Sequence, residues 1–242
     1  MAADGLTLLG FDTATVACSA ALWAGGEVRA CRRVETGGRH AEALVPMLRE
    51  VAAEGNTTLA AVDRFAVTVG PGSFTGIRIG LATARGLALA LDRPLIGLST
   101  LEVIAAGVPE AERDGPILAA LDAGRGRLYA QLFGPSLEAL GAPEALDAEA
   151  LPGLVAAKEP GAPVVVVGTG QDAALTALAP AIDARPATGS PTPDARVLVR
   201  RAAARGENAS SDGAAVRPLY LRAAGARPRS RPAASPSKTD SL

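Results

Sequence analysis

Two aspartates stand where a phosphate-binding enzyme would hold a hydrated metal ion. Asp12 and Asp122 each lead the turn of an expected β-hairpin, in the stretches "FDTAT" and "LDAGRGR". A hairpin that binds phosphate usually has a glycine directly after the aspartate, so that the backbone can approach the anion. Thr13 and Ala14 follow Asp12 instead. Hydrogen bonding within the turn is therefore the favoured role of both aspartates.

His40 and Ser73 are the other side chains whose chemistry could serve catalysis. His40 is the only histidine of the chain and begins an expected helix, whereas a metal site needs several histidine, cysteine or carboxylate groups that converge. Leu44 occupies the position one helical turn later, where a second histidine would stand. Ser73 lacks the Gly-x-Ser-x-Gly setting of a nucleophile and has no evident base. The sequence therefore predicts neither a catalytic residue nor a metal site.

A glycine-rich turn joins an expected strand to an expected helix in "VTVGPGSFTGIRIGLATARGLALAL", residues 67–91. The stretch lacks the Gly-Lys-Ser/Thr ending of a phosphate-binding P-loop, and its first three glycines are spaced one residue too far for a dinucleotide fingerprint. We predict a structural loop in which the serine caps the helix. Its residues are Gly70, Pro71, Gly72 and Ser73. Anion binding by free N–H groups at the helix start stays open as the alternative.

Small residues form a stripe along the helix that follows this turn. Gly76, Gly80, Ala84 and Ala88 stand four residues apart, so they lie nearly above one another on one face. Each glycine inside a helix costs about 0.5–1 kcal/mol relative to alanine, a cost that close packing against another element would offset. Packing is therefore favoured over phosphate binding. The stripe contacts either the chain's own strand layer or a helix of another subunit.

The expected elements occur in an order that repeats. Strands of an antiparallel meander over residues 6–34 precede a helix over 39–55, a strand over 64–70, the glycine-led helix and a strand over 93–99. At Pro116 the strand, aspartate-led turn and strand recur, followed by a helix over 147–157, a strand over 163–170 and a helix over 171–180. This order predicts an α/β fold of the actin-like type, shared by sugar kinases and the Hsp70 ATPase, with two duplicated lobes of which the second is reduced.

The same order places the boundaries between the lobes. Residues 1–100 are expected to form the first lobe, and residues 101–191 the second, reduced lobe. Residues 192–222, which begin with a last helix, are expected to pack back on the first lobe. Residues 223–242 are rich in alanine, proline, arginine and serine, a composition that predicts a disordered tail.

Composition and charge limit the classes of function. A net charge of −1 over 242 residues gives no overall basic field of the kind that nucleic-acid-binding proteins show. The first residues lack the basic region of a signal peptide, and no apolar stretch is expected to span a bilayer. Cys18 and Cys31, the only cysteines, are expected to be reduced core thiols of a cytoplasmic protein, with a disulfide as the alternative.

Five stretches give the chain a specific resemblance: "LLGFDTATVACSAAL", "RHAEALVPML", "VGPGSFTGIRIGLATARGLAL", "PLIGLSTLEVIA" and "RPLYLR". Together they resemble the TsaB (YeaZ) family over about residues 6–222, more weakly over residues 134–195. The resemblance implies a subunit of the bacterial tRNA threonylcarbamoyladenosine machinery that dimerises with and activates the transferase TsaD. TsaD carries a metal-binding His-x-x-x-His pair. The departure from that pair at Leu44 fits a non-catalytic partner.

The resemblance also implies what surrounds the chain. No cofactor is expected on this chain alone, whereas the complex uses ATP. TsaD and the ATPase TsaE are the expected partners, with a homodimer as a further form; tRNA is reached only through the complex, and no membrane is involved. Asp12 and Thr13 would be the vestige of a phosphate hairpin. The partner interface would lie on the helix at His40 and the glycine-led helix, and its expected residues are His40, Leu44, Gly76, Ile77, Gly80, Ala84, Leu87 and Ala88.

Three alternatives remain open at this point. An ATP-dependent phosphotransferase of the actin-like fold is favoured by Asp12 and the glycine loop, and opposed by the lack of a glycine after Asp12 and of a nearby lysine. A metallopeptidase is opposed by the single histidine. In the tail, Arg227, Arg229 and Arg231 could instead form an electrostatic arm that contacts tRNA phosphates.

Overall fold

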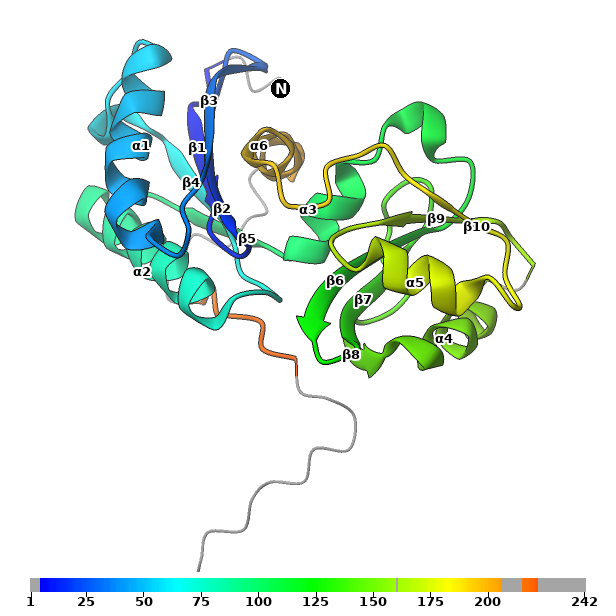
Figure 1. The fold of residues 1–242 in the computed structure, drawn as a ribbon. Coiled ribbons are helices and arrows are strands. Elements are labelled where there is room, and N and C mark those ends of the chain that lie inside the picture. The colour runs from blue at the N-terminus through cyan, green and yellow to red at the C-terminus, as the bar shows by residue number, and fades with distance from the viewer. Residues whose placement is uncertain (1–4, 160, 206–214, 222–242) are drawn as a thin grey trace, which may run out of the picture.

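The structure, a computed structural model, describes residues 5–159, 161–205 and 215–221. Within this part of the chain two five-stranded sheets stand side by side, each with helices on both faces (Figure 1). The predicted α/β class and the two duplicated lobes of the actin-like plan are confirmed. The predicted disordered tail, residues 223–242, lies outside the described residues.

The first sheet is built around the hairpin that Asp12 leads, in the order β3-β2-β1-β4-β5. Its strands are β1 (Leu8–Asp12), β2 (Ala17–Ala24), β3 (Glu27–Glu35), β4 (Arg64–Thr68) and β5 (Leu95–Leu98). β1 pairs antiparallel with β2 and parallel with β4. Because parallel strands end at the same edge of a sheet, Asp12 and Thr68 come together at the ends of β1 and β4.

Helices cover both faces of the first sheet. α1 (His40–Glu54) and α2 (Phe74–Leu91) pack on one face, around a core that includes Phe11. α6 (Ala195–Ala204) packs on the other face, where Leu198 lies in the same cluster as residues of β1, β2 and β4. Thus α6 returns to the first lobe, while the expected lobe boundaries stay predictions.

The second sheet repeats the order of the first, as β8-β7-β6-β9-β10. Its strands are β6 (Ile117–Gly124), β7 (Arg127–Phe133), β8 (Glu144–Asp147), β9 (Val164–Val167) and β10 (Ala184–Pro186). α4 (Leu151–Lys158) and α5 (Gln171–Leu178) pack on one face, and α3 (Thr100–Ala106) on the other. This lobe is reduced mainly in its helices, since α4 and α5 have eight residues each, against 15 in α1 and 18 in α2.

Some elements differ from the sequence-based expectation. β8 and β10 were not predicted, because four and three residues show no clear alternation. The helix expected over 147–157 starts as a 3-10 turn, Ala148–Ala150, before α4 begins. Two further 3-10 turns lie at Leu59–Ala61 and Glu110–Glu112. The last helix begins only at Ala195, because the carboxylate of Asp194 accepts the N–H of Arg196 at 2.8 Å and caps it.

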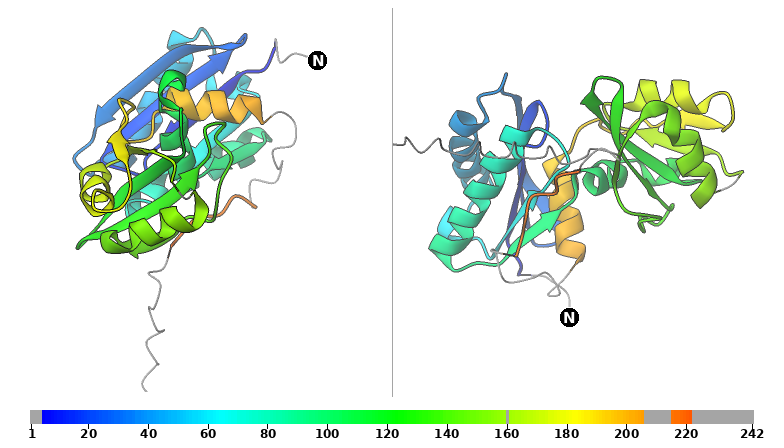
Figure 2. Two further views of the ribbon diagram at one scale, coloured as in Figure 1. Left: turned by 90° about the vertical axis from the view of Figure 1, so that its right-hand side faces the viewer. Right: turned by 90° about the horizontal axis from the view of Figure 1, so that it is seen from below.

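A pair of helices joins the lobes. α3 packs on the second sheet, and Val103 of α3 also belongs to the apolar cluster that α6 forms with the first sheet. Figure 2 shows both helices in the region between the two lobes. The relative position of the two hairpin turns therefore depends on this helix pair.

Two expectations about composition are corrected. α2 has the length and composition of a membrane span, with 18 residues and a mean hydropathy of 1.3, although no such stretch was expected. This match rests on length and composition alone, and a core helix shows both; the inward side of α2 packs against the first sheet.

Both cysteines are free. Cys18 is buried, and burial raises the pKa of its thiol to about 12, but Cys31 is exposed rather than in the core.

Candidate functional site

The turn between β1 and β2 is the place where an actin-like enzyme would hold metal and phosphate. Asp12 ends β1 and is 1% exposed. Its Oδ1 accepts hydrogen bonds from the Thr68 hydroxyl at 2.5 Å and the Ala14 N–H at 3.1 Å, while Oδ2 has no hydrogen-bond partner among the described residues. Burial raises the pKa of Asp12 to about 6, although these two bonds and the charge of Arg33 oppose it. The bond to Ala14 lies within the turn, which is the kind of hydrogen bond that the sequence favoured for Asp12.

The start of α2 covers this turn. The N–H of Ser73 donates to the carbonyl of Ala14 at 2.8 Å, and the Thr13 hydroxyl donates to the carbonyl of Gly76 at 2.7 Å. Ser73 also caps α2, accepting the Gly76 N–H at 3.2 Å. As a result Thr13 and Ala14 are each 1% exposed. The helix start therefore covers Thr13 and Ala14, the two residues that follow Asp12.

Two glycines permit this close approach. A Cβ added at Gly72 would lie 2.2 Å from the carbonyl oxygen of Ala14, and one added at Gly76 would lie 2.0 Å from the carbonyl oxygen of Thr13. No side chain fits at these distances, since backbone atoms are on both sides. Gly72 and Gly76 therefore allow close contact between the helix start and the hairpin of the same chain.

The small-residue stripe of α2 also faces the chain itself. A Cβ added at Gly80 would lie 2.4 Å from the Thr13 hydroxyl oxygen and 3.5 Å from the Val67 side chain. Of the two elements that the sequence left open, the stripe packs against the chain's own strand layer. The residues expected at a partner interface stay a prediction, and the structure shows only where they lie in this chain. All of them except Leu87, which is half-buried, are buried within this chain: His40, Leu44, Gly76, Ile77, Gly80, Ala84 and Ala88.

The outward sides of α1 and α2 are what another subunit could contact. On α1, Val45 is 38% exposed, and on α2, Leu89 is 86% exposed. The exposed residues on the outermost side of α2 are Thr75, Arg78, Ala82, Gly86, Leu89 and Ala90, so this side is free of charge after Arg78. The two helices lie next to each other on the same face of the first sheet (Figure 1), so these sides form one surface.

His40 joins the start of α1 to the hairpin turn. Its Nδ1 lies 2.5 Å from the Thr36 hydroxyl oxygen and its Nε2 lies 2.9 Å from the carbonyl oxygen of Thr15. A neutral ring satisfies both bonds when Nδ1 accepts from the hydroxyl and Nε2–H donates to the carbonyl. Both ring nitrogens are thus engaged, and Leu44 lies in the core. Among the described residues, no three histidine, cysteine or acidic side chains gather as a metal site would require.

A cleft of about 630 Å³ lies between the two aspartate-led turns. Thr15 and Val16 line it from the first lobe, and Asp122 and Tyr129 from the second. Asp122 accepts the N–H of its own Gly124 at 2.7 Å, which is again a turn role. The described residues that line the cleft include no lysine or arginine, so a polyphosphate would find no cationic side chain there.

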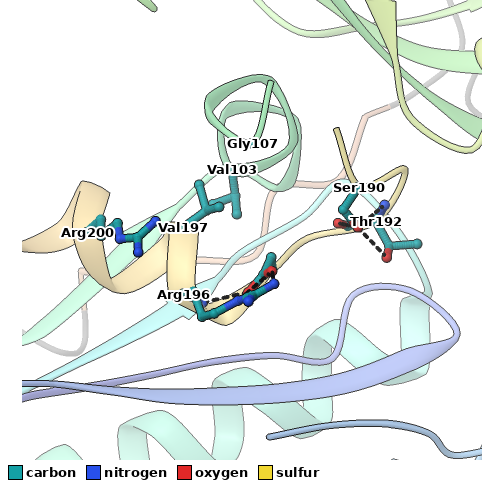
Figure 3. A pocket seen from close by; sticks show the side chains of 8 residues that line it. Val103, Gly107, Ser190, Thr192, Arg196, Val197 and Arg200 are labelled. Carbon is teal, nitrogen blue, oxygen red and sulfur yellow. Dashed lines mark hydrogen bonds and ion pairs between the residues drawn. The ribbon is translucent and has the colours of Figure 1, made fainter. Parts of the chain in front are cut away.

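A second cavity, of about 300 Å³, lies at the junction between α3, α6 and the segment that precedes α6 (Figure 3). Arg196 lines it, but its Nε donates to both carboxylate oxygens of Asp194, at 2.9 and 3.1 Å. The guanidinium of Arg33 donates to the Thr192 hydroxyl at 2.8 Å and so ties this segment to β3. The charge of Arg196 is thus paired within the start of α6, and Arg33 holds the preceding segment on the first lobe.

Sequence reasoning missed two pairings that shape the site. Thr68 completes the surroundings of Asp12, and a prediction that β1 and β4 pair in parallel would have placed it there. Phe74 of α2 stacks near Tyr220, with ring centroids 5.6 Å apart. Nothing in the local pattern relates these two residues, which are far apart in the sequence.

The chain is similar to proteins of one family. The sequence profile of the tRNA N6-adenosine threonylcarbamoyltransferase family, TsaD, matches residues 35–177. The tRNA threonylcarbamoyladenosine biosynthesis protein TsaB of Escherichia coli is 41% identical over 128 residues, which make up 51% of this chain and 53% of that protein. The chain therefore spans about half the length of such curated relatives.

Solved structures show the same relationship and the fold. YeaZ from Pseudomonas aeruginosa is 30% identical and superposes with a TM-score of 0.72, which covers 89% of this chain and 100% of that one. The ROK hexokinase from Thermus thermophilus is 14% identical and superposes with a TM-score of 0.51, covering 83% of this chain and 100% of the hexokinase. The hexokinase supports only the fold, that of the actin-like sugar kinases.

Proposed function

The chain belongs to the TsaB/YeaZ family, and from that premise we propose that it is a non-catalytic subunit of tRNA threonylcarbamoyladenosine biosynthesis, which pairs with a TsaD transferase and holds it in its active shape. In this role a separate synthase makes threonylcarbamoyl-adenylate from threonine, bicarbonate and ATP. TsaD transfers the threonylcarbamoyl group to the adenosine beside the anticodon. The present chain supplies a surface rather than a reactive group.

One observation supports the non-catalytic part of this proposal: the start of α2 packs directly on the turn that follows Asp12. Ser73 bonds to Ala14, and the Gly76 backbone lies against Thr13. The Asp12 carboxylate is buried beneath them, with a pKa raised to about 6 by burial, and the bonds of His40 leave it no free nitrogen. An ATP-dependent phosphotransferase would need the backbone after Asp12 to be open, so the burial of Thr13 and Ala14 opposes that alternative.

The pairing surface proposed is the outward side of α1 and α2. It carries the exposed apolar side chains of Val45 and Leu89, and after Arg78 the outermost side of α2 has no exposed charged residue. Both helices fall within residues 35–177, which match the TsaD family profile. Related chains that present related faces can pair across a pseudo-twofold axis, so the same surface would serve both the pair with TsaD and a homodimer.

The remaining parts of the proposal follow from the family. TsaE, an ATPase, is proposed to dock on the pair, and the ATP requirement belongs to the complex rather than to this chain. The protein is proposed to act in the cytoplasm, with no membrane attachment.

Co-purification with TsaD tests the pairing with a matched pair of variants. Ala82→Glu puts a carboxylate on the outermost side of α2, and Ala156→Glu makes the same change on the exposed side of α4, in the other lobe. Burying an unpaired carboxylate in an interface is costly. We therefore expect Ala82→Glu to lose TsaD and Ala156→Glu to retain it. Equal retention of TsaD by both variants, with both folded, would contradict the proposed surface.

A nucleotide-hydrolysis assay on the chain alone decides between the proposal and the phosphotransferase. The accessory role predicts no hydrolysis without TsaD and TsaE. Turnover of ATP by the isolated chain, abolished by Asp12→Asn, would instead support the phosphotransferase.

A further inference from the structure

Two exposed aromatic rings lie where the first turn of α2 meets the C-terminal end of the described chain. Phe74 is 56% exposed and Tyr220 is 44% exposed, in a chain whose residues are only 3% aromatic. The other three phenylalanines, Phe11, Phe65 and Phe133, are buried. Exposed rings in so aromatic-poor a chain indicate a contact surface.

The rings are held in a fixed arrangement around an arginine. Their centroids are 5.6 Å apart and their planes are inclined by 34°. The guanidinium carbon of Arg78 lies 3.3 Å from the centre of the Phe74 ring and 5.6 Å from that of Tyr220. Leu219, next to Tyr220, donates its N–H to the carbonyl of Val69 at 2.7 Å. The surface is therefore formed before any partner binds, which lowers the entropic cost of binding.

Positive charge is concentrated at this end of the chain. Residues 215–242 contain six basic residues and one acidic residue, whereas residues 1–214 contain 18 basic and 24 acidic residues. Arg217 is exposed and lies in the same segment as Tyr220. Helix α2 contains two arginines, Arg78 and Arg85, and no acidic residue. The second of these, Arg85, donates to the carbonyl of Val216 and fixes the segment along the helix. Such segregation, in a chain with a net charge of −1, indicates a polyanionic partner.

We propose that Phe74, Arg78, Arg217 and Tyr220 form a surface that contacts RNA, where an unpaired base stacks on the rings and the arginines bind phosphate oxygens. Proteins take up single-stranded RNA by stacking bases on aromatic side chains, and arginine supplies charge and further stacking. RNA is favoured over a protein partner because the exposed charges of this surface, Arg78 and Arg217, are of one sign and adjoin a basic stretch of sequence. The RNA is tRNA, a choice that rests on the proposed function.

Binding of the full-length chain to unmodified tRNA, at several salt concentrations, tests the proposal. Phe74→Ala and Tyr220→Ala each remove one exposed ring, and we expect each to weaken binding by about 5- to 150-fold. Arg217→Ala should flatten the plot of log affinity against log salt by about one unit. Arg49→Ala removes the same charge from the exposed side of α1, as the matched control, and should change neither the slope nor the stacking contribution.

The outcomes separate this inference from the proposed function. Absence of tRNA binding by the unmodified chain at low salt overturns it, as does equal affinity of the ring variants and the unmodified chain. Loss of TsaD pairing by Tyr220→Ala with unchanged tRNA affinity also overturns it, and assigns the rings to a protein contact. Pairing of the unmodified chain with TsaD decides the proposed function whatever the RNA result. Unchanged thermal unfolding of the variants shows that binding, and not folding, was altered.

Discussion

Gly76 and Gly86 lie in the same helix, yet alanine should have opposite effects at the two positions. A Cβ at Gly76 would lie 2.0 Å from the carbonyl oxygen of Thr13, a backbone atom of the hairpin turn. At Gly86 no described atom outside the local helix backbone lies within 4 Å of such a Cβ. Gly76→Ala therefore forces the start of α2 away from the turn, whereas Gly86→Ala meets only solvent.

The difference in stability between the two variants follows from one effect that they share and one that they do not. Both gain helix propensity, about 0.5–1 kcal/mol for glycine to alanine inside a helix. Only Gly76→Ala also introduces overpacking, which typically costs about 1–3 kcal/mol. We expect Gly86→Ala to stabilise the protein by about 0.5–1 kcal/mol, and Gly76→Ala to be about 1–3 kcal/mol less stable than that variant.

Urea unfolding followed by far-UV circular dichroism gives both free energies from the midpoint and slope of the transition. Equal slopes show that the change lies in the stability of the native state and not in the denatured ensemble. If Gly76→Ala is as stable as Gly86→Ala, the close contact between α2 and the hairpin turn does not exist, and the covered phosphate position fails with it.

Three further predictions concern the buried polar groups and the tail. Burial raises the pKa of Asp12 from 3.8 to about 6, so the folded chain binds the proton more tightly than the unfolded chain. The free energy of unfolding should therefore fall as pH rises from about 4 to about 6, by about 3 kcal/mol from this group. Asp12→Asn should remove that fall. If the free energies of unfolding of the unmodified chain and of Asp12→Asn change with pH in the same way, the predicted contribution of Asp12 is excluded. His40→Phe leaves the Thr36 hydroxyl and the Thr15 carbonyl without their partner, and should lower the free energy of unfolding by about 1–3 kcal/mol; chemical denaturation measures this, and an unchanged midpoint counts against the role. Truncation after Arg222 should leave stability within about 0.5 kcal/mol, and a large drop in calorimetric melting temperature would show that the tail packs on the domain.

Hydrophobic periodicity and turn residues carried enough information for the main elements. α1 and α2 follow from apolar residues at helical spacing, and the two hairpins from apolar strands on either side of Asp12 and Asp122. Because both hairpins open the same sequence of elements, the duplicated fold could be predicted as well. β8 and β10 could not, because strands of four and three residues depend on pairing with a distant neighbour.

The sequence alone did not show which side of a helix faces the core. The stripe with Gly80 and the outward side with Gly86 are both made of small residues, and helical spacing shows only that each is a face. Which face is inward depends on Thr13 and Val67, which lie on other elements of the lobe. The same holds for His40, whose two bonds run to a residue before its helix and to a residue in the first hairpin turn.

Transfer of the threonylcarbamoyl group by TsaD, with and without this chain, tests the central claim most directly. The assay contains tRNA, the synthase that makes threonylcarbamoyl-adenylate, ATP, TsaE and purified TsaD, and it measures modified adenosine in the tRNA. An accessory subunit predicts strong modification only when both the chain and TsaD are present, and none when TsaD is omitted. Modification by the chain in the absence of TsaD, or full activity of TsaD in the absence of the chain, would contradict the account.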